Sequence, residues 1–171
     1  MESINSEILT LTYGGIVRQL VADHENVGEV NTQLKKMGRN VGTRLIDEYL
    51  AATKTTSCSN FQETADKIAT VGMKMFLNAT ASVSDWNAEG TACTIVIQGN
   101  PLTDFVQLPD DLQSLQYNNI ICGVIEGALD MINIQVECEC SKDALQGDPS
   151  TELRLVLIES RTEQYPFKED E

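Results

Sequence analysis

The chain has 171 residues, and its 26 acidic and 12 basic side chains give a formal net charge of -14. Because 42% of the residues are hydrophobic, the chain can bury a core and is neither disordered nor fibrous. So acidic a surface repels phosphate, which argues against binding to nucleic acid or docking on anionic lipid. No apolar run approaches the ~18 residues of a membrane span, and the first residues lack a signal-peptide pattern, so we predict a soluble cytoplasmic protein.

Three helices are predicted in the first half of the chain, where apolar residues recur every three or four positions. They cover residues 5–22, 28–52 and 60 to about 77. In the first, one face collects Ile8, Leu11, Ile16 and Leu20. In the third, the apolar stripe comprises Phe61, Ala65, Ile68, Gly72, Met75 and Phe76, and Asn60 forms the N-terminal cap.

Gly38 and Gly42 stand four residues apart inside the second predicted helix. Glycine in a helix costs about 1 kcal/mol relative to alanine. We therefore interpret the pair as a place where another backbone comes close, either within the fold or across a dimer.

The second half of the chain is predicted to contain strands around one long helix. Alternating residues predict strands at 93–98, 103–108, 134–140 and 153–158, and apolar spacing predicts a helix from 110 to about 132. Helices segregated from antiparallel strands indicate an α+β fold, a single domain with helices packed on one face of a twisted antiparallel sheet. We expect this domain to cover residues 1–160 and residues 161–171 to form a flexible acidic tail.

The candidate catalytic groups are few. His24 is the only histidine, flanked by acidic residues, and a solvated position at a helix end is the favoured interpretation. The five cysteines include no CxxC pair, which argues against a disulfide framework or a zinc site, and we expect no metal. Four of them occupy apolar-face positions, whereas Cys58 lies in a polar turn before a helix, where a thiol is either reactive or an ordinary loop residue.

Six segments together resemble the Bet-three type small core subunit of the TRAPP vesicle-tethering complexes. They are EILTLTYG (7–14), GRNVGTRLI (38–46), FQETAD (61–66), NPLTDFVQLP (100–109), YNNIICGVI (117–125), and GD followed by TELR (147–154). No single segment is decisive, but six in this order and spacing are highly specific. The resemblance spans nearly the whole chain.

The resemblance implies a non-catalytic subunit acting in transport between endoplasmic reticulum and cis-Golgi. It implies pairing with other TRAPP small subunits through the first two helices, or with itself when isolated. The predicted pairing residues are Leu34, Gly38, Val41, Gly42 and Leu45. The assembled complex would act as exchange factor for a Rab/Ypt-type GTPase, near which the C-terminal segment would lie, and would bring the chain to the membrane surface only peripherally.

The family also implies a palmitoyl chain on the cysteine that aligns with Cys58, held in an apolar channel. The predicted lining comprises Ile68, Val71, Gly72 and Met75. Two positions depart from the family. Some members have Arg where this chain has Ser57, next to the cysteine, and relatives often have Arg where this chain has Glu126. If the latter residue meets a partner, the contact has changed sign.

Two other classes of function remain open at this point. A small-ligand or lipid-binding regulatory domain of related fold is the main alternative, because related folds bind small molecules. A thiol enzyme would have to use Cys58 with His24 as its base.

Overall fold

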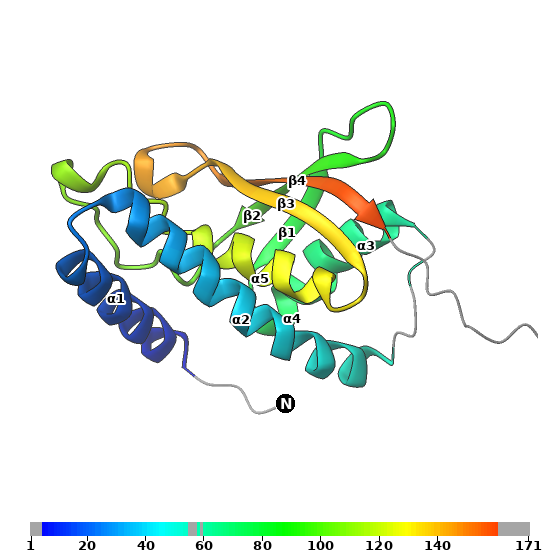
Figure 1. Ribbon diagram of the computed structural model, residues 1–171, viewed down its shortest axis with the longest axis horizontal. Helices are drawn as coiled ribbons and strands as arrows, with labels where there is room; N and C mark the ends of the chain where they lie inside the picture. The colour runs from blue at the N-terminus through cyan, green and yellow to red at the C-terminus, as the bar shows by residue number, and fades with distance from the viewer. Residues whose placement is uncertain (1–4, 55–57, 59, 161–171) are drawn as a thin grey trace, which may run out of the picture.

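The computed structural model describes residues 5–54, 58 and 60–160. Its helices are α1 (Ser6–Asp23), α2 (Val27–Thr53), α3 (Phe61–Lys67), α4 (Met73–Leu77) and α5 (Asn119–Asp130), with short turns η1 (Ile68–Gly72), η2 (Asp110–Leu112) and η3 (Ala144–Gln146). Its strands are β1 (Thr80–Ser84), β2 (Ala92–Gln98), β3 (Ile134–Lys142) and β4 (Thr151–Ser160). The strands form one antiparallel sheet in the order β1-β2-β4-β3, and the helices lie on one side of it (Figure 1). The predicted α+β class is confirmed.

Asparagine side chains begin the three helices of the first half. The side-chain oxygen of Asn5 accepts from the Glu7 amide at 2.9 Å, and that of Asn26 accepts from the Gly28 amide at 2.7 Å. Asn60 accepts from the Glu63 amide at 2.8 Å, as its predicted cap role requires. Each bond satisfies an amide that the first helical turn leaves without a partner.

The core lies between the helices and the inner face of the sheet. Ile95, Leu153 and Leu155 are fully buried on the two central strands, and Leu34 from α2 is fully buried as well. Alternation places the charged residues of β3, such as Glu137 and Glu139, on the solvent side. The strands predicted at 93–98, 134–140 and 153–158 are thus confirmed.

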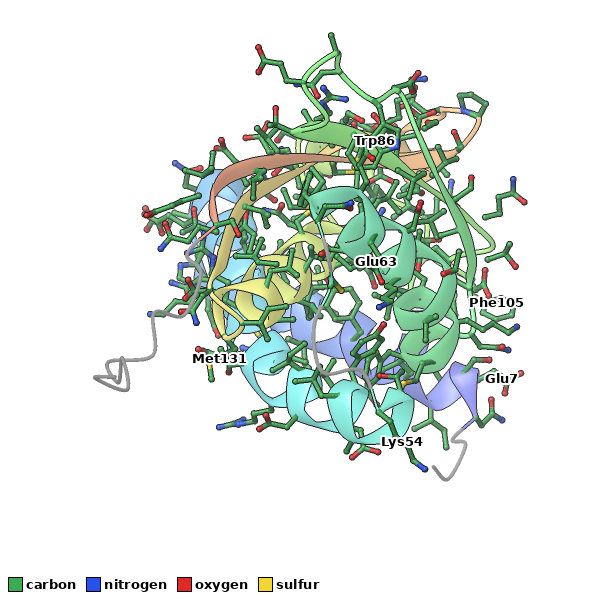
Figure 2. The ribbon with its side chains drawn as sticks, turned by 90° about the vertical axis from the view of Figure 1, so that its right-hand side faces the viewer. Glu7, Lys54, Glu63, Trp86, Phe105 and Met131 are labelled. Atoms are coloured by element: carbon green, nitrogen blue, oxygen red, sulfur yellow. The ribbon has the colours of Figure 1, made fainter. Side chains whose placement is uncertain are left out.

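The predicted first hairpin is wrong in its second strand. Residues 103–108 are turns and irregular backbone, and the partner of β2 is the preceding strand β1. Phe105 has a φ of +64°, a conformation that a bulky side chain seldom adopts in a strand, and it is 89% exposed (Figure 2). β1 escaped prediction because its Thr, Ala and Ser residues give almost no hydrophobic alternation.

The helix predicted from residue 110 to about 132 is shorter than expected. Only η2 and α5 are helical, because side chains bind the intervening backbone in other ways. Asn31 of α2 donates to the Ser114 carbonyl at 3.1 Å and accepts from the Gln116 amide at 2.8 Å. Asn118, which is fully buried, bonds the side chains of Asn100 and Asp143 at 2.7 and 3.0 Å. These bonds fix a compact loop instead of a helix.

The third predicted helix is present but contains a π turn. The Met73 amide bonds the Ile68 carbonyl, five residues back, so η1 holds one residue more than an α-helical turn. The buried stripe is consequently Phe61, Ala65, Ala69 and Met73. Ile68 and Gly72, which the regular period predicted on that stripe, are only half-buried.

Candidate functional site

Cys58 lies in the connection between α2 and α3 and is half-buried. The thiol lies close enough to Tyr49 on α2 and to Lys67 on α3 for an electrostatic interaction, which places it between these two helices. Burial, followed by the charge of Cys58, raises the pKa of Tyr49. Lys67 pairs with Glu63 at 2.7 Å, and this hydrogen bond is the main reason why the pKa of Lys67 is raised.

The other four cysteines are packing residues. Cys93, Cys122 and Cys138 are fully buried and Cys140 is half-buried. Burial raises the pKa of Cys93 to about 11 and that of Cys140 to about 12, and a hydrogen bond with Cys122 raises the pKa of Cys138. Thiols with raised pKa values react slowly because the thiolate is the nucleophile. Cys58 therefore remains the candidate for modification.

The predicted channel residues lie in the π turn η1 and in α4, which comes directly after it. Ile68, Gly72 and Met75 are half-buried, and Val71 is exposed. A Cβ atom added at Gly72 would have only the Lys67 carbonyl oxygen nearby, at 3.9 Å, so the space beside this glycine is open. Two surface cavities in the described part of the chain, of about 250 and 390 Å³, are lined by other residues. The channel stays a prediction.

The glycines of α2 pack against glycines of α5 in the same chain. A Cβ atom at Gly38 would meet the Ile120 carbonyl, and one at Gly42 would meet the Val124 carbonyl. Reciprocally, Cβ atoms at Gly123 and Gly127 would meet the backbone of α2. The two helices run side by side in the same direction, backbone against backbone. The close approach that the glycine spacing predicted lies within the fold.

This packing corrects part of the predicted pairing surface. Leu34, Gly38 and Gly42 are buried inside one chain and present nothing to a partner. Val41 is 40% exposed and Leu45 is half-buried, so their pairing role stays a prediction. Sequence reasoning did not place the exposed face of α1, where Ile8 and Leu11 are 60% and 74% exposed while Thr10, Tyr13 and Val17 point inward. The spacing showed an apolar face but not which face the core would use.

Glu126 is an internal ion-pairing residue, so in this chain it is not exposed for the partner contact that was considered as a condition above. It is 4% exposed and sits on α5. One carboxylate oxygen accepts from the Lys35 ammonium at 2.9 Å and from the Cys138 amide at 2.8 Å. The other accepts from Arg39 at 2.6 and 2.8 Å. A single carboxylate thus ties α2 and α5 to strand β3.

His24 and Cys58 are not brought together. His24 ends α1 and lies 3.1 Å from Glu29, before the 27 residues of α2, whereas Cys58 follows that helix. A helix of that length separates its ends by about 40 Å. The geometry gives no support to a Cys–His pair.

The described residues offer neither a metal site nor a membrane-spanning helix. Among them no group of three or more His, Cys, Asp or Glu side chains converges on a point that could hold a metal ion. Within the same residues, none of the helices combines the length and the apolar character needed to cross a bilayer.

The fold defines a class of α+β proteins with helices on one face of an open four-stranded antiparallel sheet. A structure of a trafficking protein particle complex subunit 3 from Naegleria fowleri, covalently bound to palmitic acid, matches with a TM-score of 0.90 and 47% identity, covering 95% of this chain and 100% of that one. An H-NOX protein from S. oneidensis matches with a TM-score of 0.61 at 9% identity, covering 92% and 78% of the two chains, which shows the fold alone.

The family match is more specific. The Transport protein particle (TRAPP) component family covers residues 9–156. Trafficking protein particle complex subunit 3 of Dictyostelium discoideum is 46% identical, over 99% of this chain and 92% of its own length. Subunit BET3 of Saccharomyces cerevisiae is 39% identical, over 99% and 89%. The chain belongs to the TRAPP component family, and the predicted resemblance is confirmed.

Proposed function

We propose that this chain is a non-catalytic core subunit of a TRAPP-type tethering complex and carries a buried acyl chain on Cys58. The observation that carries the proposal is the covalent palmitic acid in a relative 47% identical to this chain. Cys58 is the one cysteine outside the regular elements, in the connection that leads from α2 into α3, and Gly72 lies further along the helical segment that follows it, with open space at its side.

The energetics favour a structural role for the lipid. Burying an acyl chain stabilises by roughly 0.8 kcal/mol per methylene, on the order of 10 kcal/mol as an upper bound. The half-buried apolar face of Ile68, Gly72 and Met75 would take up that chain. A chain held there belongs to the core and does not anchor the protein in a membrane.

The mass of the intact protein, before and after hydroxylamine, tests the acylation. Wild type is expected to carry a palmitoyl-sized mass that hydroxylamine removes, because hydroxylamine cleaves thioesters. Gly72→Leu is expected to lose this mass, since the added side chain fills the open space. Thr70→Leu is the matched control, because Thr70 is exposed on the same π turn. A normally acylated, folded Gly72→Leu protein would refute the channel assignment.

We also infer that the chain pairs with other TRAPP small subunits through α1 and α2. The exposed Ile8 and Leu11 on α1 and Val41 on α2 supply an apolar contact of the kind that helices bury between subunits. Leu11→Glu is expected to abolish co-purification with the paired subunits. Ile158→Glu, at an exposed residue of β4, is the control. Unchanged pairing in Leu11→Glu would exclude this surface.

The assembled complex would act as exchange factor for a Rab/Ypt-type GTPase, at the endoplasmic reticulum and cis-Golgi, with the chain itself held at the membrane only through its partners. The test is nucleotide exchange on the GTPase by the complex with and without this subunit. If the complex without this subunit catalysed nucleotide exchange at the full rate, the proposed role of the subunit in assembling the exchange factor would be refuted. A non-covalent small molecule that survives in native mass spectra would instead favour the ligand-binding alternative.

A further inference from the structure

The sheet ends in two edge strands, β1 and β3, and only one of them is closed. The main chain of Cys138 on β3 is engaged by side chains on its outer side: its amide donates to Glu126 at 2.8 Å and its carbonyl accepts from Lys35 at 3.0 Å. Both side chains belong to the ion cluster around the buried Glu126 described above. The edge of β3 is therefore covered by side chains at Cys138, and covering an edge is one way in which proteins prevent unwanted strand pairing.

The outer edge of β1 has no such cover. Residues 80–84 pair with β2 on one side, and in the described part of the chain nothing hydrogen-bonds to their main chain on the other side. Thr80 and Ser82 are exposed, and Ala81 and Val83 are only half-buried although they pack against the core. The strand carries no charge and no proline, the residues that usually blunt an edge.

The residues around β1 indicate what kind of strand could pair with its outer edge. Ala81 and Val83 face the core side, so a strand laid beside them would place apolar residues there. The following loop exposes Asp85 and Glu89, and residues 75–141 contain no Lys or Arg. Arg154 on β4 donates to the Asp85 carbonyl at 3.0 Å. A complementary strand would carry basic or polar residues on its outer side.

We propose that the open edge of β1 is a docking site for an extended segment of a partner protein, in which apolar residues alternate with basic ones. The segment would continue the sheet beyond β1 by main-chain hydrogen bonds, with its apolar residues over the helical layer. The strand itself contains neither Cys58 nor any residue of α1 or α2.

A short synthetic peptide of alternating Val and Lys, labelled with fluorescein, is the probe for this site. Fluorescence anisotropy with the full chain is expected to show binding, and hydrogen exchange of residues 80–84 is expected to slow. N-methylation of alternate peptide bonds should weaken binding by about tenfold or more, because it removes the main-chain donors. A peptide of alternating Val and Glu should bind more weakly than the Lys peptide.

Variants of the chain locate the binding. Ala81→Lys should weaken binding by about tenfold, because an added strand would cover a charge that reaches solvent in the free edge. Glu137→Gln changes the net charge equally on exposed β3 and should leave binding unchanged. Absent binding, equal binding of the N-methylated peptide, or exchange unchanged at β1 would each overturn the proposal. Self-association of the chain that Ala81→Lys abolishes would overturn it too, because the occupant would then be a second copy.

Discussion

Glycine serves opposite purposes in two helical regions of this molecule. Between α2 and α5, a Cβ atom at any of four glycines would collide with the backbone of the facing helix. On the segment from α3 to α4, a Cβ atom at Gly72 would meet only the Lys67 carbonyl, at an ordinary contact distance of 3.9 Å. The first region is packed to the limit, and the second leaves room.

The difference separates stability from ligand binding. Close helix packing gains dispersion contacts across its whole length, so it tolerates no added atom. An apolar helix next to open space lacks those dispersion contacts on that side unless a ligand fills the space. The same residue type thus marks the rigid half of the fold in one place and the proposed acyl site in the other.

The largest expected effect comes from adding a methyl group in the packed region. Gly123→Ala would drive a Cβ atom into the Lys35 carbonyl and to within 2.9 Å of the Arg39 nitrogen. Since backbone cannot yield as a side chain can, we expect a loss of about 3 kcal/mol or more in the free energy of unfolding, measured by urea denaturation. Gly15→Ala, on the open side of α1, is the control. If both variants were equally stable, the α2–α5 interface would not be packed more tightly than the open region, and the comparison would fail.

Removing the carboxylate that joins α2, α5 and β3 should have the next largest effect. Glu126→Gln leaves Lys35 and Arg39 without their counter-charge, and we expect a loss of about 2 to 3 kcal/mol because the partners are partly solvated. Glu137→Gln, at an exposed acid on the same sheet, should change stability little. A Glu126→Gln protein as stable as this control would show that the ion cluster adds nothing.

Raising the pH should test the burial of two thiols, Cys93 and Cys140, because burial raises the pKa values of both. Cys93 lies near Asp66 of α3 and Cys140 near Cys122 of α5, and burial raises their pKa values to about 11 and about 12 from 9.0. Each thiol makes its full contribution to the free energy of unfolding below about pH 9. That contribution is lost as the pH rises through these pKa values, because the thiol of the unfolded chain ionises first. At pH 10 we expect each to have cost about 1 kcal/mol. A flat free energy of unfolding between pH 8 and pH 10 would contradict the burial of these thiols.

The smallest effect is expected at Gly72. Its backbone angles, φ -62° and ψ -51°, suit any residue, and the neighbouring space is open. Gly72→Ala should therefore leave the free energy of unfolding of the unacylated chain unchanged or raise it by up to about 1 kcal/mol through helix propensity. A marked loss of stability would mean that the segment is as tightly packed as the α2–α5 interface.

Much of the fold could be predicted because its signals are local. The helices α1 and α2, the cap at Asn60, three of the strands and the buried cysteines all follow from spacing and residue type. The turn at Phe105, the loop around Asn118 and the edge strand β1 could not be predicted. They depend on hydrogen bonds to residues distant in sequence, or on pairing with a strand that carries the hydrophobic signal for both.

The sequence by itself determined the class of fold, the family and the cysteine that stands apart from the core, because period, composition and motif order are written in the chain. Only the tertiary structure decided which face of α1 is exposed and that Glu126 points inward. It also decided that Gly38 and Gly42 meet α5, whereas Gly72 meets almost nothing. The physical reason is that a spacing pattern shows that a face is apolar or a residue small, whereas its partner depends on how distant segments pack.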